Sequence, residues 1–338
     1  MKAIRIYKFG PTEEVLQYED IPTPKPGPEE MLVKVEAASL NRADLGLRSG
    51  SYRIAPADLP IIPGREFAGT IVSVGSAVQE YRVSQRVVAQ PGLGGYAEFA
   101  LAKADKTRPV PDGVESVVAA AMPTIFLTAW FALVQDAGMK ASDQVLIQAG
   151  GSGVGIAAIQ IAKHLGTRVI TTAGTDDKCR RLHDLGADET INYTVKDFKK
   201  EVLQLTGGRG TDVVLEMVGG DVYTKSLEVL APNGRLVSIG GAAGAGPTPD
   251  SLPTLTEGRK VSRFSITSLL SSHPEAFTQL DTFLGLVQEK KFQVVIGRTF
   301  PLAEARAAQR YLEGREHFGK VVLTIYFGET FHDQAPMR

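Results

Sequence analysis

Short apolar runs alternate with helix-length amphipathic patterns through the middle of the chain, from about residue 142 to residue 241. The helical patterns are about 8 to 13 residues long, which is typical of βαβ units around a parallel sheet. The pattern predicts five strands and four helices, arranged as a doubly wound Rossmann sheet with right-handed crossovers. The predicted strands cover residues 145–149, 168–173, 189–193, 212–220 and 236–241.

The two ends of the chain have a different pattern. Residues 2–121 form short strands broken by Pro and Gly, which predicts an irregular β-rich domain. Pro and Gly crowd again at residues 240–253, and this stretch is interpreted as a loop. Because the nucleotide-type sheet is complete by Gly241, the tail is expected to return to the first domain. The tail pattern is a helix at 277–290, a strand at 294–300, a helix at 302–314 and a strand at 320–326.

A glycine-rich turn, AGGSGVG at residues 149–155, lies between the first predicted strand and the helix after it. Glycine allows a tight turn and a close approach to a pyrophosphate, and the N-terminus of the helix favours the anion. The register that begins directly after the strand has Gly150, Ser152 and Gly155 at the key positions. A register shifted by three residues, ending at Ala158, fits the usual letters but begins too late. The residues predicted to contact a dinucleotide are Gly150, Ser152, Gly153, Val154 and Gly155.

The end of the second predicted strand carries no acidic residue, where an NAD enzyme would hold the ribose hydroxyls with Asp or Glu. This leaves room for a 2′-phosphate and favours NADPH as the cofactor. Lys178 offers a cation and Tyr193 a hydroxyl donor. Asp176 and Asp177 oppose this interpretation unless they point away, and Lys178 could also be an ordinary exposed lysine.

Charge and cysteine content exclude several classes of function. The chain has 37 Lys and Arg against 38 Asp and Glu, without long runs of either sign, so neither a nucleic acid nor a membrane surface is predicted as a partner. Residues 1–10 lack the apolar core of a signal peptide, and no stretch approaches about 18 apolar residues, so a cytosolic location is expected. Cys179 is the one cysteine, which excludes an intrachain disulfide and a multi-cysteine zinc site.

Several motifs in a fixed order carry a resemblance that covers nearly the whole chain. It resembles the medium-chain dehydrogenase/reductase superfamily, and within it the zinc-free quinone oxidoreductase branch that includes zeta-crystallin. The motifs are NRAD at 41–44, SGSY at 49–52, PGREFAG at 63–69, LTAW at 127–130, the glycine turn, AGT at 173–175, LGAD at 185–188, INY at 191–193 and HFGK at 317–320.

The resemblance implies an α/β fold with two domains. A GroES-like β-rich catalytic domain is expected from residues 1–123 and 268–338, and a Rossmann NADP-binding domain from residues 124–267. It also implies NADPH as cofactor and a homodimer.

The resemblance implies that no metal is bound. In the zinc-dependent relatives the first ligand is a cysteine where this chain has Asn41, and the second is a histidine where it has Arg65. The third ligand should fall near Pro123 and Thr124, and neither can replace it. Zinc prefers thiolate and neutral imidazole. Without a Lewis acid the expected hydride acceptor is a small conjugated carbonyl compound, a quinone or an enone, whose new negative charge is delocalised.

The resemblance also assigns roles to individual residues. Tyr52 is the candidate hydrogen-bond donor near the substrate, and Asn41 is expected to position the nicotinamide or the substrate. Lys320 is predicted to contact the cofactor from the terminal domain, although a solvated strand lysine is an alternative. Asp44 is expected to support Asn41. The remaining predicted cofactor contacts are Thr128, Gly174, Thr175, Gly240, Gly241, Phe264 and Ser265.

Two other functions fit the same sequence. An enoyl-thioester reductase of the same superfamily would share the fold and NADPH but act on an acyl-CoA or acyl-carrier substrate. A non-catalytic NADPH-binding sensor or structural protein would bind the cofactor without turnover. Turnover with a quinone, an enoyl-CoA or an alkenal distinguishes the three.

Overall fold

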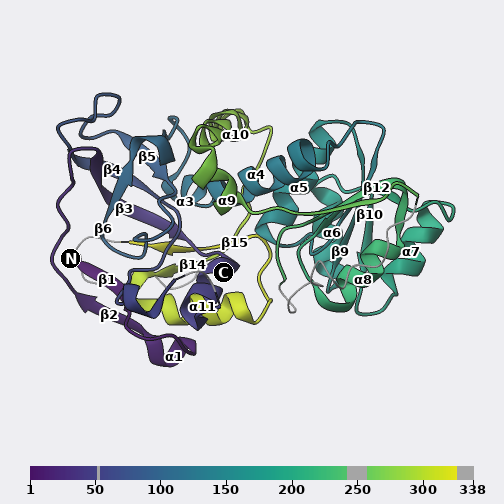
Figure 1. The fold of residues 1–338 in the computed structure, drawn as a ribbon, viewed down its shortest axis with the longest axis horizontal. Coiled ribbons are helices and arrows are strands. Elements are labelled where there is room, and N and C mark those ends of the chain that lie inside the picture. Colours follow the sequence, from purple (N-terminus) through teal and green to yellow (C-terminus); the bar gives the residue numbers. More distant parts are fainter. Residues whose placement is uncertain (52–53, 242–256, 326–338) are drawn as a thin grey trace, which may run out of the picture.

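The computed structural model describes residues 1–51, 54–241 and 257–325. It divides into two halves that lie side by side in Figure 1, one around a seven-stranded sheet and one around a six-stranded parallel sheet. The predicted α/β fold, a GroES-like half and a Rossmann half, is confirmed.

The six-stranded sheet is parallel throughout and has the order β10-β9-β8-β11-β12-β13. The chain leaves β8 toward β9 and β10, and later crosses to the other side of β8 to form β11. Doubly wound sheets bind ligands at the carboxyl ends of the strands beside such a reversal. The strands are β8 (Gln144–Ile147), β9 (Arg168–Ala173), β10 (Glu189–Asn192), β11 (Thr211–Glu216), β12 (Leu230–Ser238) and β13 (Lys260–Arg263). The helices between them are α5 (Gly153–His164), α6 (Asp176–Asp184), α7 (Phe198–Leu205) and α8 (Gly220–Glu228).

One prediction about this sheet is wrong, because it is not complete at Gly241. A sixth strand, β13, pairs in parallel with β12, with Leu236 opposite Val261. Its sequence KVSR is short and largely polar, and its side chains are exposed or half-buried. Such an edge strand lacks the apolar run by which the four inner strands can be recognised.

The second sheet joins both ends of the chain. Its order is β14-β15-β3-β4-β5-β7, and β6 pairs with β3. Its strands are β3 (Glu30–Ser39), β4 (Phe67–Val74), β5 (Arg86–Ala89), β6 (Phe99–Lys103), β7 (Thr107–Pro109), β14 (Ile296–Pro301) and β15 (Lys320–Thr324). β15 runs antiparallel to β3, with Val322 opposite Ser39. This pairing brings the start of β15 next to the residues that follow β3. A separate pair, β1 (Lys2–Ile6) and β2 (Leu16–Asp20), is antiparallel.

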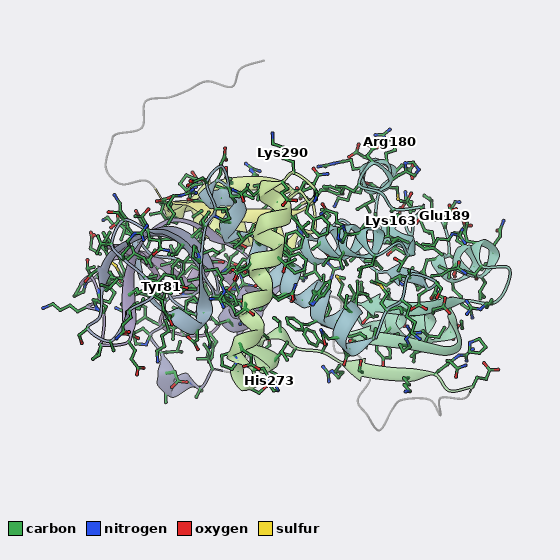
Figure 2. All side chains as sticks on the ribbon, turned by 90° about the horizontal axis from the view of Figure 1, so that it is seen from above. Tyr81, Lys163, Arg180, Glu189, His273 and Lys290 are labelled. Atoms are coloured by element: carbon green, nitrogen blue, oxygen red, sulfur yellow. The ribbon has the colours of Figure 1, made fainter. Side chains whose placement is uncertain are left out.

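Apolar helices fill the space between the two sheets. Figure 1 shows α4 (Met122–Trp130), α9 (Ile266–Ser272) and α10 (Leu280–Gln288) in this position. Phe126 of α4 stacks on Phe283 of α10 with ring centroids 5.0 Å apart. Seen from above, the segment from His273 to Lys290 runs across the middle of the molecule (Figure 2). The other helices are α1 (Thr12–Val15), α2 (Arg42–Ser49), α3 (Ser116–Ala120) and α11 (Ala305–Glu313).

Within residues 1–51, 54–241 and 257–325, no helix combines the length and the apolar character that crossing a bilayer requires.

Candidate functional site

The glycine turn lies between β8 and α5, at the carboxyl edge of the parallel sheet. Ala149 begins it with a φ of 51°, and Ser152 is the N-cap of α5, where its hydroxyl accepts the N–H of Gly155 at 3.0 Å. This cap explains a serine at the position where the motif usually has glycine. The N–H groups of Gly153 and Val154 remain at the open end of the helix, which suits a pyrophosphate.

Close packing explains two of the glycines in the turn. A Cβ atom on Gly155 would lie 2.6 Å from the carbonyl oxygen of Ala149. A Cβ atom on Gly150 would lie 2.1 Å from Thr171 Oγ1, whose hydroxyl is donated to the Ile147 carbonyl. No side chain fits at either position without moving the turn.

Both halves of the molecule contact the turn. A Cβ atom on Gly153 would lie 2.6 Å from Lys320 Cδ at the start of β15 and 3.0 Å from Ile125 Cγ2 in α4. The Gly319 N–H donates to the Gly151 carbonyl at 2.8 Å. The predicted site residues in the turn, α4 and β15 are therefore neighbours in space.

A buried polar cluster lies beside this junction. Lys320 Nζ donates to the Leu40 carbonyl at 2.8 Å, to Asn41 Oδ1 at 2.7 Å and to Glu66 Oε1 at 3.2 Å. Glu66 Oε1 also accepts from Asn41 Nδ2 at 2.9 Å and from the Ser39 hydroxyl at 2.7 Å. An ammonium group has three donors, and the protein supplies three acceptors for them.

The surroundings lower the pKa of Glu66 and raise the pKa of Asp44. Burial alone would raise the pKa of Glu66, but the Lys320 ammonium and the hydrogen bonds from Asn41 and its neighbours outweigh burial and lower it. Burial raises the pKa of Asp44 to about 6, although the charge of Arg65 partly offsets this. Asp44 accepts the Asn41 backbone N–H at 2.8 Å, so it supports Asn41 as expected from the motif.

Several buried side-chain atoms have no hydrogen-bond partner within the described ranges, and two of them belong to a residue of α4 and to a residue that contacts α4. They are Thr128 Oγ1 in α4 and Gln90 Oε1 after β5, and these side chains are 6% and 5% exposed. Gln90 Nε2 donates to Thr124 Oγ1 at 2.7 Å. An unpaired buried hydroxyl costs free energy, so both atoms fit a region that a ligand completes.

The residues predicted to hold a 2′-phosphate lie together at the end of β9. A Cβ atom on Gly174 would lie 2.8 Å from Tyr193 Oη, and Thr175 caps α6 by accepting the Lys178 N–H. Lys178 Nζ donates to the Arg315 carbonyl at 3.0 Å. The Lys178 side chain also passes the glycine turn, because its Cδ would be 3.6 Å from a Cβ on Gly151.

Two further side chains lie near the predicted 2′-phosphate position, the cation Arg181 and the neutral His317, and the sequence does not predict either of them. The Arg181 guanidinium lies 3.7 Å above the Phe318 ring, and Phe318 borders Gly151. Burial and the nearby charges of Lys178, Arg42 and Lys320 lower the pKa of His317 to about 4. The HFGK motif at residues 317–320 marks this segment as part of the site. That it lies against the glycine turn follows only from the tertiary fold.

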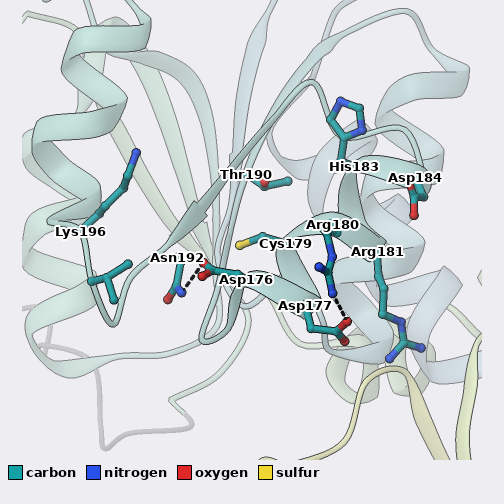
Figure 3. Close-up of a pocket in the computed structure, with 11 residues that line it drawn as sticks. Asp176, Asp177, Cys179, Arg180, Arg181, His183, Asp184, Thr190, Asn192 and Lys196 are labelled. Carbon is teal, nitrogen blue, oxygen red and sulfur yellow. Dashed lines mark hydrogen bonds and ion pairs between the residues drawn. The ribbon is translucent and has the colours of Figure 1, made fainter.

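The two acids that opposed a phosphate have partners of their own. The Asp176 carboxylate accepts Asn192 Nδ2 at 2.7 Å, and Asp177 pairs with Arg180 at 2.7 Å. Figure 3 shows both interactions in the wall of an open cleft of about 700 Å³ between α6 and β10. Arg180 offsets the charge of Asp177, whereas Asn192 is a neutral donor that holds the Asp176 carboxylate in place.

The remaining predicted residues fall into two groups. Gly240 follows β12 near Met217, whose sulfur accepts the Ser152 hydroxyl at 3.4 Å, and Gly241 follows it. The Phe264 N–H donates to the Ser238 carbonyl at 2.9 Å, and Ser265 caps α9. All four thus lie on the segments after β12 and β13. Tyr52 lies outside the described residues.

The residues at the positions of a zinc site do not fit a metal. Among the residues that the structure describes, no group of three His, Cys, Asp or Glu side chains could hold one. Asn41 is bound to Glu66 and Lys320, and the Arg65 guanidinium donates to Thr267 Oγ1 at 2.5 Å. Lys320 and Arg65 are cations that would repel a metal ion at this position, and neither an ammonium nor a guanidinium group is a zinc ligand.

Two family models match the chain. Residues 27–112 match the alcohol dehydrogenase GroES-like domain, and residues 185–323 match the zinc-binding dehydrogenase domain. The second description names zinc, and the positions that the resemblance assigns to two zinc ligands hold Asn41 and Arg65 in this chain.

Proteins similar along almost their whole length support the same relationship. The chain is 35% identical to a quinone oxidoreductase of Pseudomonas aeruginosa, with 95% of this chain and 99% of that protein covered. It is 32% identical to a 2-haloacrylate reductase of a Burkholderia species, covering 96% and 98%. The solved structure of the Escherichia coli quinone oxidoreductase complexed with NADPH superposes with a TM-score of 0.90 at 31% identity, covering 96% and 100%.

Proposed function

The chain belongs to the medium-chain dehydrogenase/reductase superfamily, in its quinone oxidoreductase branch, and on that premise we propose that it uses NADPH to reduce a quinone or an α,β-unsaturated carbonyl compound without zinc. An NADPH-dependent oxidoreductase follows from the relatives and from the solved complex with NADPH. The acceptor class and the zinc independence are the steps that we add.

The buried cluster of Asn41, Glu66 and Lys320 carries this proposal. In a zinc-dependent relative this region would hold a Lewis acid that stabilises the alkoxide formed from a plain ketone. Here it offers an N–H of the Asn41 amide, which is held between the two members of the Glu66–Lys320 ion pair. Donors of this kind support an oxyanion whose charge is spread over a conjugated system. The 2-haloacrylate reductase among the relatives acts, by its name, on a conjugated acceptor.

Three parts of the chain would hold the cofactor. The open N-terminus of α5 suits the pyrophosphate, with the N–H groups of Gly153 and Val154. Lys178, Tyr193 and Arg181 surround the place for the 2′-phosphate. When bound, NADPH supplies a hydride from C4 of its nicotinamide. The chain would bind and orient the nicotinamide through Thr128 and exclude water with the apolar helices between the sheets.

The Thr128→Val variant tests the nicotinamide contact. Valine has the same shape, and the hydroxyl it removes is buried without a partner within the described residues. We therefore expect the free energy of unfolding to stay within about 1 kcal/mol of the wild type or to rise. The NADPH dissociation constant should increase about tenfold. Fluorescence titration and urea unfolding measure the two effects, and unchanged NADPH affinity would remove Thr128 from the site.

The Lys178→Ala variant tests the choice of nucleotide. A lysine that meets a 2′-phosphate makes a charge-assisted hydrogen bond, so its loss should weaken NADPH binding about tenfold. NADH lacks this phosphate, and its affinity should hardly change. Lys163→Ala is the control. Lys163 lies at the C-terminal end of α5, away from the glycine turn, and pairs there with Asp188. Equal wild-type affinity for NADH and NADPH would contradict the assignment.

Initial rates of NADPH oxidation test the acceptor. We expect turnover with phenanthrenequinone and with a simple alkenal, and a higher kcat/KM for these than for crotonyl-CoA. A clear preference for crotonyl-CoA would favour the enoyl-thioester reductase. No turnover with any of the three would favour a non-catalytic NADPH binder.

Three expectations from the sequence stay predictions. They are the homodimer, the cytosolic location and the domain limits at 1–123 with 268–338 and at 124–267. The pairing of β15 with β3 supports a domain built from both chain ends.

A further inference from the structure

The Asn41 side chain is held by two oppositely charged groups. We infer that Glu66 and Lys320 fix the Asn41 amide in one orientation, so that it meets the acceptor carbonyl oxygen as a hydrogen-bond donor. The inference rests on the proposed function, in which Asn41 faces the reaction. It gives Glu66 and Lys320 positioning roles, which neither the motifs nor the relatives assign.

The chemistry of the two neighbours allows a single orientation of the amide. Asn41 Oδ1 accepts from the Lys320 ammonium at 2.7 Å, and Asn41 Nδ2 donates to the Glu66 carboxylate at 2.9 Å. If the amide were turned over, its NH₂ group would face an ammonium that can only donate. Its oxygen would face a carboxylate that can only accept. Both contacts would become repulsive, so the orientation follows from chemistry as well as from the coordinates.

Both neighbours are themselves held in position. Glu66 accepts the Thr124 N–H of α4 at 2.7 Å and the Ser39 hydroxyl of β3 at 2.7 Å, and its side chain is fully buried. Lys320 donates to the Leu40 carbonyl at 2.8 Å, and its side chain is 5% exposed. The amide is therefore tied through β3, α4 and β15 at once.

One N–H of the amide remains available for a ligand. Nδ2 carries two hydrogens, and among the described residues Glu66 is the acceptor that it reaches. The ammonium on Oδ1 draws electron density from the amide, which strengthens the remaining N–H as a donor. A fixed donor in a dry site stabilises a developing oxyanion without reorganising. Asn41 Oδ1 already accepts a hydrogen bond from Lys320, so the group that the amide offers to the substrate is its second N–H.

A mutant cycle on Asn41 and Glu66 separates positioning from general damage. Asn41→Asp keeps the size but replaces the NH₂ donor with an acceptor, and should lower kcat with phenanthrenequinone about 100-fold. Glu66→Gln removes the charge and turns an NH₂ group toward either Asn41 Nδ2 or the Thr124 N–H, which weakens the hold on the amide. It should lower kcat about tenfold, with the NADPH dissociation constant within about twofold of the wild type. The double variant should be no slower than Asn41→Asp, because Glu66 acts through the group that is already lost.

The control variant is Asp143→Asn. It breaks a partly buried ion pair with Arg235 at 2.6 Å, before β8 and therefore at the opposite edge of the parallel sheet. Its kcat should stay within about twofold of the wild type, which excludes a general effect of losing a buried charge. If Glu66→Gln does not fold, Glu66→Asp replaces it. That variant keeps the charge for Lys320 but withdraws the carboxylate from Asn41, and the same pattern is expected.

The possible outcomes separate this inference from the proposed function. A double variant about 1000-fold slower than the wild type would mean independent effects, and would overturn the positioning role while leaving quinone reduction intact. An Asn41→Asp enzyme with unchanged kcat would overturn the donor role and the positioning role together. Absence of quinone turnover by the wild type would refute the proposed function itself, and the inference with it.

Discussion

The Lys320→Met variant is expected to lose about 3 to 5 kcal/mol of unfolding free energy at neutral pH, because it leaves the fully buried Glu66 carboxylate without its cation. Methionine retains most of the apolar stem, so the loss reports the charge rather than the packing. Urea denaturation followed by circular dichroism measures it. A loss below about 1 kcal/mol would mean that Glu66 is neutral or solvated, and would contradict the buried ion pair.

The same variant should change the pH dependence of stability. In the wild type the pKa of Glu66 is lowered on folding, so its contribution is present above the unfolded pKa and is lost as pH falls through the folded pKa. Without Lys320, burial raises that pKa, and the folded variant takes up a proton as pH falls. The deficit of the variant should therefore shrink as pH falls toward the ordinary glutamate pKa of about 4.3 and below it. Lys196→Met breaks the exposed pair with Glu201 and should hardly change the free energy of unfolding at any pH.

The Gly155→Ala variant is expected to damage both stability and cofactor binding. Its Cβ would lie 2.6 Å from the Ala149 carbonyl oxygen and 2.7 Å from Gly150 Cα, and backbone atoms cannot turn away as a side chain can. We expect a loss of about 3 kcal/mol in unfolding free energy. NADPH affinity should fall more than tenfold, because the turn must open at the pyrophosphate position.

A second helical glycine provides the matched control. Gly285 lies in α10, and a Cβ there would have no heavy atom within 4 Å. Gly285→Ala should therefore stabilise the protein by about 0.5 to 1 kcal/mol and leave NADPH binding unchanged. If Gly155→Ala also retains stability and affinity, the tight contact between β8 and α5 does not matter to the site.

Local patterns were sufficient for the parts of the fold that have a strong periodic signal. The inner strands of the parallel sheet are continuous apolar runs, and the turn after β8 follows from its glycines and the helix behind it. β13 was missed because an edge strand with exposed polar side chains has no such run. α2 was also missed, because its eight residues begin directly after β3 without a long amphipathic pattern.

The candidate site shows a different limit of sequence reading. The motifs predict Asn41 and Lys320 as site residues, but not that both contact Glu66, because Glu66 and Lys320 are 254 residues apart in the chain. Lys320 begins an apolar strand and Glu66 precedes one, so each looks locally like the edge of a strand. The pairing of β15 with β3 makes them neighbours. Long-range strand pairing of this kind cannot be read from the residues on either side.

The claim that this protein reduces its acceptor without zinc is tested most directly by the effect of metal removal on its activity. The enzyme should be dialysed against a strong zinc chelator, its metal content measured, and its kcat with NADPH and phenanthrenequinone compared with that of the untreated protein. Reduction supported by Asn41 and the Glu66–Lys320 pair predicts the same kcat before and after, with far less than one zinc per chain. Loss of activity on chelation that is restored by one equivalent of zinc would contradict it.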